Sequence, residues 1–90
     1  MRAVVVVLGQ DRPGIIAKVS GVLYEYNSNI LDINQTVLQG DLFSMVLLAD
    51  MDKLNAPFDQ LKDALCACAS QLGVDIQVQR EEIFQSMHRI

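Results

Sequence analysis

Tryptophan is absent from this 90-residue sequence, histidine occurs once and cysteine twice. His88 has no second histidine and no cysteine near it in the sequence, which argues against a metal centre or a nucleophile–base pair built on it. Cys66 and Cys68 stand two positions apart in a segment with helical periodicity, so their side chains point to different faces and are not placed to bridge each other or to hold one metal. Both are expected to be small packing residues. We therefore expect no metal, no cofactor and no enzymatic activity.

Basic residues are few and scattered. The net charge is −4 at pH 7, and no two of the 7 lysines and arginines are adjacent, unlike the basic patch of a protein that binds a nucleic-acid backbone. No apolar run approaches the roughly 20 residues of a membrane-spanning helix. Met1 and Arg2 lead straight into a short apolar run rather than into the core of a signal peptide. We expect a cytoplasmic protein that binds neither nucleic acid nor membrane.

Apolar residues are plentiful, at 51% of the chain. This fraction suffices for one packed domain, and the length leaves no room for a second core. It is high for a small monomer without tryptophan, so we expect a second copy to cover a sheet edge or face.

The spacing of the apolar residues predicts six elements in the order βαββαβ. An unbroken apolar run at 4–8 predicts a central strand covered on both faces, whereas strict alternation predicts a strand with one exposed face or edge. Gln39, Gly40 and Asp41 predict a tight turn within a hairpin. The remaining elements are a helix over 15–26, an alternating strand over 30–39, a more deeply placed strand over 42–51, a helix over 58–72 with its N-cap region near Asn55 and a C-cap at Gly73, and an alternating strand over 74–79.

This order predicts a single α+β domain: a split-βαβ sandwich with two helices on one face of a four-stranded antiparallel sheet. The runs at 4–8 and 42–51 are expected at the centre and the alternating strands at the edges, which leaves the strand over 30–39 available to pair with another chain. In residues 81–90 the apolar positions predict about two turns of amphipathic helix, which docks on its own sheet or on a partner.

The segment from Gly9 to Gly14 joins the first strand to the first helix. Gly9 permits any φ, Asp11 is expected to cap the helix, and Pro13 fits its first turn, which leaves backbone N–H groups for a carboxylate or a phosphate. Structural roles are equally open: Gly14 could simply let the helix pack closely, Asp11 could only cap it, and Arg12 is either solvated or pairs with a carboxylate.

The stretch from Gly9 to Ala17, followed by Asn29 to Ile33, resembles the ACT domain, a small module that binds amino acids and regulates metabolic enzymes and transcription. Residues 29–36 and 83–90 more closely resemble UPF0237, a group of stand-alone ACT proteins similar to the ACT-containing repressors of the glycine cleavage system. The resemblance covers the whole chain and implies the ferredoxin-like form of the βαββαβ fold.

The resemblance also implies a ligand site shared between two copies. Its residues would be Gly9, Asp11, Arg12, Pro13, Gly14 and Ile15 of one copy, with Asn29 and Ile30 of the other. Amino-acid-binding relatives often carry histidine and asparagine at the positions of Gly9 and Asp11; an ionised Asp11 would repel a ligand carboxylate but accept an ammonium group. Asn29 could instead end the first helix in left-handed geometry.

We expect a regulatory homodimer that binds a small-molecule effector, an amino acid. The alternative is a protein-interaction module with no small-molecule ligand, which assembles through the strand over 30–39 or through the C-terminal segment.

Overall fold

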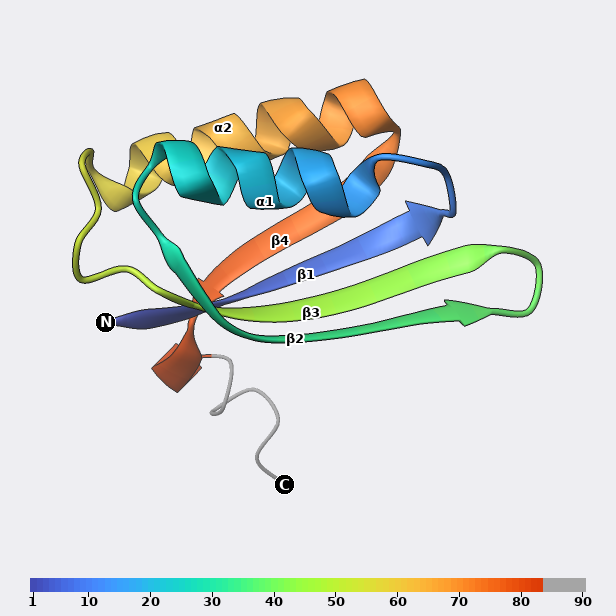
Figure 1. Ribbon diagram of the computed structural model, residues 1–90, viewed down its shortest axis with the longest axis horizontal. Coiled ribbons are helices and arrows are strands. Elements are labelled where there is room, and N and C mark those ends of the chain that lie inside the picture. Colours follow the sequence, from blue (N-terminus) through green and yellow to red (C-terminus); the bar gives the residue numbers. More distant parts are fainter. Residues whose placement is uncertain (84–90) are drawn as a thin grey trace.

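Six elements form the chain over residues 1–83, the part that the computed structural model describes (Figure 1). Their order is the predicted βαββαβ. Apart from the first strand, which is longer than the apolar run at 4–8, every element begins and ends within one residue of the predicted bounds. The bounds are Arg2–Gln10 for β1, Ile15–Glu25 for α1, Asn29–Leu38 for β2, Leu42–Asp50 for β3, Phe58–Leu72 for α2 and Val74–Arg80 for β4.

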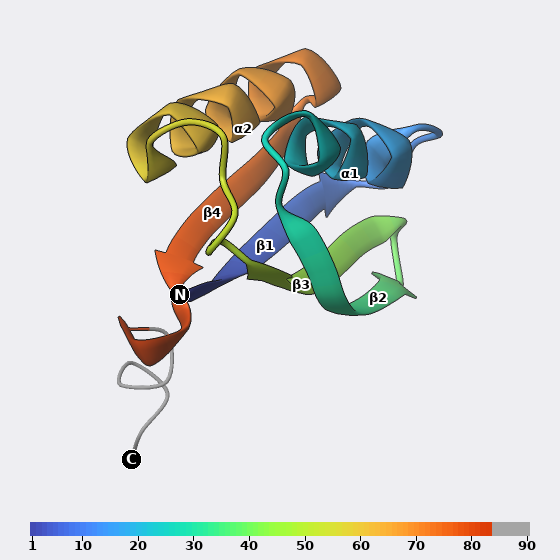
Figure 2. The same ribbon diagram turned by 60° about the vertical axis from the view of Figure 1, so that its left-hand side comes forward.

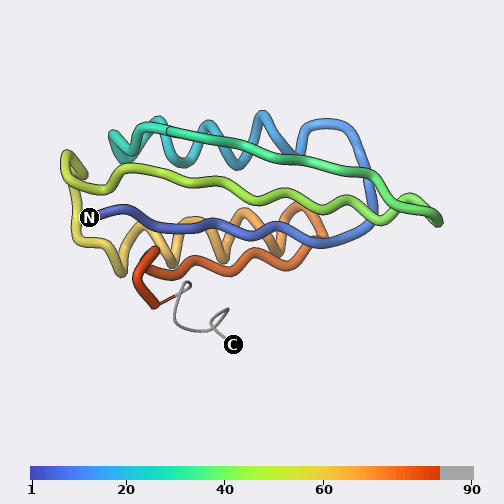
Figure 3. Tube along the Cα trace, turned by 90° about the horizontal axis from the view of Figure 1, so that it is seen from below, coloured from blue at the N-terminus to red at the C-terminus, as the bar shows by residue number. Residues whose placement is uncertain are grey.

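The sheet has the strand order β2-β3-β1-β4, and every neighbouring pair is antiparallel. Both helices cover the same face (Figures 1 and 2), and the view from the opposite side shows the four strands lying next to one another (Figure 3). The predicted central and edge positions are confirmed. The predicted turn between β2 and β3 closes with left-handed backbone at Gly40, φ 79°, and Asp41, φ 60°.

The hydrophobic core lies between the two helices and the sheet face that they cover. Alternate residues of the central strands point into it, as the two-residue repeat of a strand requires. The helices contribute side chains spaced three and four apart, which form one stripe on each helix. The fully buried members are Ala3, Val5 and Val7 of β1, Ala49 of β3, Val19 and Leu23 of α1, and Leu61 and Leu65 of α2.

The opposite face of the sheet is less well covered than the sequence predicts. Along β1 on this face Val4 is buried, Val6 is half-buried and Leu8 is 41% exposed. Val46 of β3, which pairs with Val6, is 38% exposed. The prediction that the whole run at 4–8 is covered on both faces is therefore wrong for Leu8, because α1 and α2 both lie on the other side.

The predicted C-terminal end of α2 is confirmed, but its predicted N-cap is not. Gly73 adopts the left-handed backbone of a C-cap, with φ 70°. At the start of the helix Pro57, in extended geometry, occupies the N-cap position, and no side chain caps the helix. Asn55 is therefore not the N-cap; its side-chain amide donates a hydrogen bond to the Glu25 carbonyl at 2.9 Å and ties this connection to the end of α1.

Residues 81–83 form a helical turn after β4, joined to the start of β1 by Glu81, whose Oε1 accepts hydrogen bonds from Nε and Nη2 of Arg2 at 2.9 and 2.6 Å. The rest of the predicted docking helix, residues 84–90, lies outside the described residues. No helix within residues 1–83 is long and apolar enough to cross a membrane.

Candidate functional site

The β1–α1 loop, residues 11–14, is held at one end of the sheet by two hydrogen bonds. The Asp11 backbone N–H donates to the Asp41 carbonyl at 2.7 Å, which ties the loop to the β2–β3 turn. The Arg12 guanidinium donates to the Leu72 carbonyl at 2.8 Å, at the end of α2. A cavity of about 340 Å³ lies between these attachments, lined by Gln10, Asp11, Arg12, Leu72 and Gly73.

The start of α1 differs from the prediction. The N-cap position belongs to Gly14, whose φ of 92° is left-handed, and no side chain accepts a hydrogen bond from the first turn. Asp11 is therefore not the cap, and Pro13 precedes the helix rather than standing in its first turn. Because a glycine provides the N-cap, the N–H groups that a capping side chain would otherwise satisfy are left without one.

Packing accounts for the glycine at position 9. Gly9 pairs with Phe43 of β3 and Val74 of β4. A Cβ atom at this position would lie 2.7 Å from Cγ1 of Val74 and 2.9 Å from its Cβ. Carbon atoms in contact are normally about 3.5 to 4.0 Å apart, so β4 leaves no room for a side chain here.

The structure brings together only part of the predicted ligand set. Asp11, Arg12, Pro13 and Gly14 are exposed on the loop. Ile15, in contrast, is 2% exposed and packs in the core, so only its backbone could meet a ligand.

Asn29 and Ile30 lie at the other end of the sheet. Asn29 begins β2 and pairs with Asp50 at the end of β3, which in turn pairs with Arg2 at the start of β1. At about 3.4 Å per residue, the stretch of β1 from Arg2 to Gly9 separates the two groups by roughly 24 Å. The alternative that Asn29 ends α1 in left-handed geometry is wrong, because Asn27, with φ 60°, does so.

A second cavity, of about 200 Å³, lies where α1 gives way to β2. It is lined by Tyr24, Asn27, Ser28, Asn29, Asp50 and Lys53. Asn29 was the only one of these predicted from the sequence. A polar segment directly after a buried strand, such as the one that follows Ala49, is the signal that could have indicated the contribution of Asp50 and Lys53.

A third cavity, of about 350 Å³, opens between α1 and α2, where Ala17, Lys18, Gly21, Ala64, Ala67 and Cys68 are among the lining residues. Burial raises the pKa of the Cys68 thiol above its ordinary value, against the opposing effect of Lys18. Cys66 is exposed, so the prediction that both cysteines are packed holds for Cys68 only. No group of three or more His, Cys, Asp or Glu within residues 1–83 is placed to hold a metal ion.

Comparison with known proteins agrees with the fold. Residues 2–79 match the family model of the ACT domain. An UPF0237 protein of Methanopyrus kandleri is 49% identical over 89 residues, which cover 99% of this chain and 98% of the relative. The solved structure of an ACT domain protein from Streptococcus pneumoniae superposes with a TM-score of 0.80 at 38% identity, covering 93% of each chain.

A formyltetrahydrofolate deformylase from Pseudomonas syringae superposes with a TM-score of 0.79 at 27% identity, but 88% of this chain covers only 27% of that enzyme. That similarity therefore concerns one part of a larger protein. The architecture and the loop between β1 and α1 thus define an ACT domain, which is a regulatory ligand-binding module. More narrowly, the chain belongs to the UPF0237 family of ACT-domain proteins.

Proposed function

We propose that this chain is a regulatory module that binds an amino acid as a homodimer. The ligand lies between the β1–α1 loop of one protomer and the start of β2 in the other. The role is cytoplasmic and non-catalytic, and it involves neither nucleic acid nor membrane.

The observation that carries this proposal is the exposed edge strand β2. Nine of its ten residues are exposed and Ile30 is half-buried. Two of its apolar side chains, Ile33 and Val37, are 42% and 53% exposed. Edge strands of monomeric proteins are usually protected by proline, by several charges or by being short. β2 has ten residues, no proline and one charged side chain, Asp32, so pairing with a second β2 is the arrangement that it favours.

Antiparallel pairing of two β2 strands about a two-fold axis would complete the ligand site. In such a pair the start of one strand lies beside the end of the other. The end of β2 leads into the turn whose Asp41 carbonyl accepts the hydrogen bond from the Asp11 N–H. Asn29 of the partner subunit would therefore lie near the β1–α1 loop, although the two are far apart within one chain.

The chemistry of the loop suits an amino acid. The first turn of α1 has no side-chain cap, so its N–H groups are available to a carboxylate, an anion that helix N-termini commonly bind. The exposed Asp11 carboxylate can accept hydrogen bonds from an ammonium group. A ligand with both groups therefore matches the loop better than a simple anion does.

The dimer is tested by light scattering after Val37→Glu, which would place two like charges at the edge. We expect the mass to fall from dimer to monomer, whereas the matched change Gln77→Glu on the opposite edge strand, β4, leaves a dimer. If Val37→Glu leaves the mass unchanged, β2 is not the interface.

The ligand is tested by thermal unfolding of the dimer with each common amino acid at millimolar concentration. A ligand present at 100 times its dissociation constant stabilises the folded state by about 2.7 kcal/mol. We expect at least one amino acid to raise the melting temperature. If none does, the chain is the protein-interaction module that forms the alternative.

A further inference from the structure

The cavity at the start of β2 contains two opposite charges that do not pair. Asp50 and Lys53 both line this volume of about 200 Å³. Neither forms an ion pair with the other or with any charged group of residues 1–83. The Asp50 carboxylate accepts one hydrogen bond, from the Asp52 backbone N–H at 2.9 Å. Two unpaired opposite charges that share one cavity are suited to a ligand that carries both signs.

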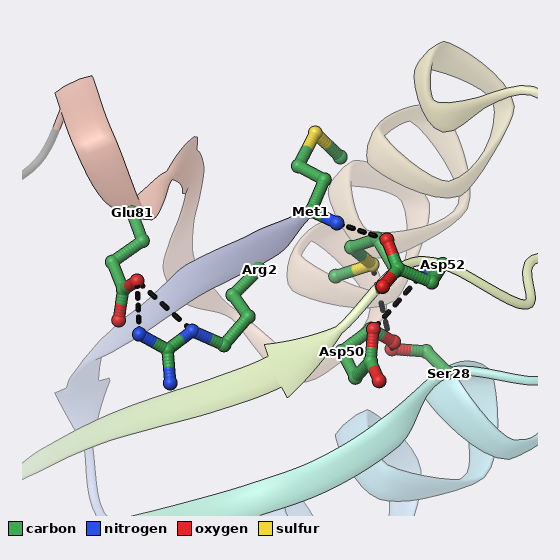
Figure 4. A network of polar contacts seen from close by, with 7 residues as sticks. Met1, Arg2, Ser28, Asp50, Asp52 and Glu81 are labelled. Atoms are coloured by element: carbon green, nitrogen blue, oxygen red, sulfur yellow. Dashed lines mark hydrogen bonds and ion pairs between the residues drawn. The ribbon is translucent and has the colours of Figure 1, made fainter.

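Two charged groups near Asp50 are already paired. The N-terminal ammonium group of Met1 contacts the Asp52 carboxylate, and Arg2 pairs with Glu81 at 2.6 Å (Figure 4). Arg2, which pairs with Asp50 in the sheet register, and Asp52, two residues after it, are thus already in ion pairs. Asp50 and Lys53 both line the cavity and form no ion pair within residues 1–83.

Both residues are held by the segment that joins α1 to β2. Ser28 is 8% exposed, and its hydroxyl donates to the Asp50 carbonyl at 3.1 Å (Figure 4). Asn27 donates from its side-chain amide to the Lys53 carbonyl at 2.8 Å. The backbones that carry the two charges are thus fixed to one short segment, so the cavity is organised before a ligand arrives, which lowers the entropic cost of binding.

From this arrangement we infer that the cavity helps to bind the charged end of a small α-amino acid in the shared site. Lys53 holds the carboxylate together with the first-turn N–H groups of the other protomer's α1, Asp50 holds the ammonium group together with Asp11, and the amide of Asn29 donates or accepts beside them. The inference rests on the proposed function and extends it, because this cavity is then the half of the shared site that the partner subunit provides. Pockets for drug-sized ligands measure roughly 300 to 1,000 Å³. A volume of about 200 Å³ therefore suits the charged end of an amino acid rather than a larger ligand.

The hydrogen bond that Arg12 already makes within the chain supports this assignment. Its guanidinium donates to the Leu72 carbonyl at 2.8 Å and thereby holds the loop to α2. Binding a ligand carboxylate through Arg12 would compete with that contact. The ammonium group of Lys53 has no competing partner within residues 1–83, so it is the cation that a carboxylate can take without loss.

The test is isothermal titration calorimetry of the full chain with glycine, L-alanine and L-serine. Asp50→Asn keeps the shape of the side chain and removes its charge, and Lys53→Gln removes the charge with a side chain one atom shorter. Because hydrogen bonds to charged groups are among the strongest polar contacts, we expect each change to weaken binding by about tenfold or more. The matched controls are Lys62→Gln and Asp63→Asn on the exposed side of α2, which leave the affinity unchanged.

Glycinamide, which keeps the ammonium group but lacks the carboxylate, separates the role of Lys53 from a general effect on folding. Lys53→Gln is expected to weaken glycine binding and to leave glycinamide binding unchanged, whereas Asp50→Asn weakens both. Equal affinity of the unmodified protein for glycine and glycinamide would overturn the inference even if a variant failed to fold.

The failure of this inference can be told apart from that of the proposed function. If the amino acids bind and neither Lys53→Gln nor Asp50→Asn weakens them, while Asp11→Asn or Arg12→Ala does, the cavity assignment is wrong and the proposed function stands. If none of the common amino acids binds the unmodified dimer, the proposed function is wrong, and the cavity assignment is wrong with it.

Discussion

Replacing Gly9 by alanine tests whether packing against β4 dictates the glycine at this position. The new Cβ would lie 2.7, 2.9 and 3.0 Å from the Cγ1, Cβ and Cα atoms of Val74. Two of these three atoms belong to the backbone or are bonded directly to it, and the pairing of Gly9 with Val74 keeps them in place. A rotamer change at Val74 therefore relieves only the first contact.

The cost of the Gly9→Ala change follows from this geometry. Adding a methyl group to a packed interior typically costs about 1 to 3 kcal/mol. We expect a value in the upper half of that range, because the β1–β4 pairing must shift. For a domain of this size each kcal/mol corresponds to roughly 4 to 8 °C in melting temperature. The free energy of unfolding is measured by urea denaturation at one fixed protein concentration, because the proposed dimerisation would contribute to the apparent stability.

A double-mutant cycle with Val74→Ala identifies the cause. This second change removes Cγ1 but keeps Cβ and Cα, so the penalty of Gly9→Ala falls by about 0.5 kcal/mol or more without vanishing. Gly21→Ala in α1 is the matched control, since a Cβ there meets no atom within 4 Å. Alanine is the better helix former by about 1 kcal/mol, so the control is expected to be more stable than the parent protein. A Gly9→Ala protein as stable as the parent would refute the packing argument.

Three further predictions concern the cysteines and the loop. Cys66 is exposed and is expected to react with a thiol reagent in the folded protein, whereas Cys68 is expected to react only after unfolding. Mass spectrometry of the labelled chain would show this difference. Labelling of both cysteines at the same rate would contradict the burial of Cys68. Burial raises the pKa of the Cys68 thiol in the folded state, so the unfolded chain loses this proton at a lower pH than the folded chain does. We therefore expect the free energy of unfolding to stay constant with respect to this group below the ordinary pKa of 9.0 and to fall as the pH rises above it. A Cys68→Ala variant should show a smaller fall. Arg12→Ala removes the hydrogen bond to the Leu72 carbonyl and should lower the free energy of unfolding by about 1 kcal/mol. Hydrogen exchange in the last turn of α2 should become faster. Unchanged exchange there would show that the contact does not hold the loop.

The fold could be predicted from the sequence because local patterns and global packing agree. Val74, Ile76 and Val78 alternate with polar residues, and β4 is an edge strand whose inner face alone is buried. Periodicity was also the better guide to the cysteines. Cys68 lies on the apolar stripe of α2 and is buried, whereas Cys66 lies off it and is exposed. The general tendency of cysteine to be buried was the weaker argument.

The site could be predicted only in part, because it depends on contacts between residues far apart in the sequence. Arg12 donates to Leu72, sixty positions away, and no pattern in either segment indicates this contact. Gly14, and not Asp11, occupies the N-cap position, with a left-handed φ. Glycine permits this conformation but does not require it, so the sequence alone does not predict it. The contribution of Lys53 to the cavity beside Asn29 depends on how the connection after β3 folds back towards the end of α1.

The topology explains why the proposed site needs two chains. After β1, α1 runs back along the sheet, so the loop before α1 and the segment after it lie at opposite ends of one protomer (Figure 1). A ligand that contacts both segments therefore binds only where a second protomer supplies the missing half. Such a ligand has different affinities for monomer and dimer, which is the condition for shifting an assembly equilibrium. By linkage, the factor by which such a ligand tightens the dimer equals the factor by which dimerisation tightens the binding of the ligand. In the proposed function this reciprocity is the means by which the module would report an amino-acid concentration.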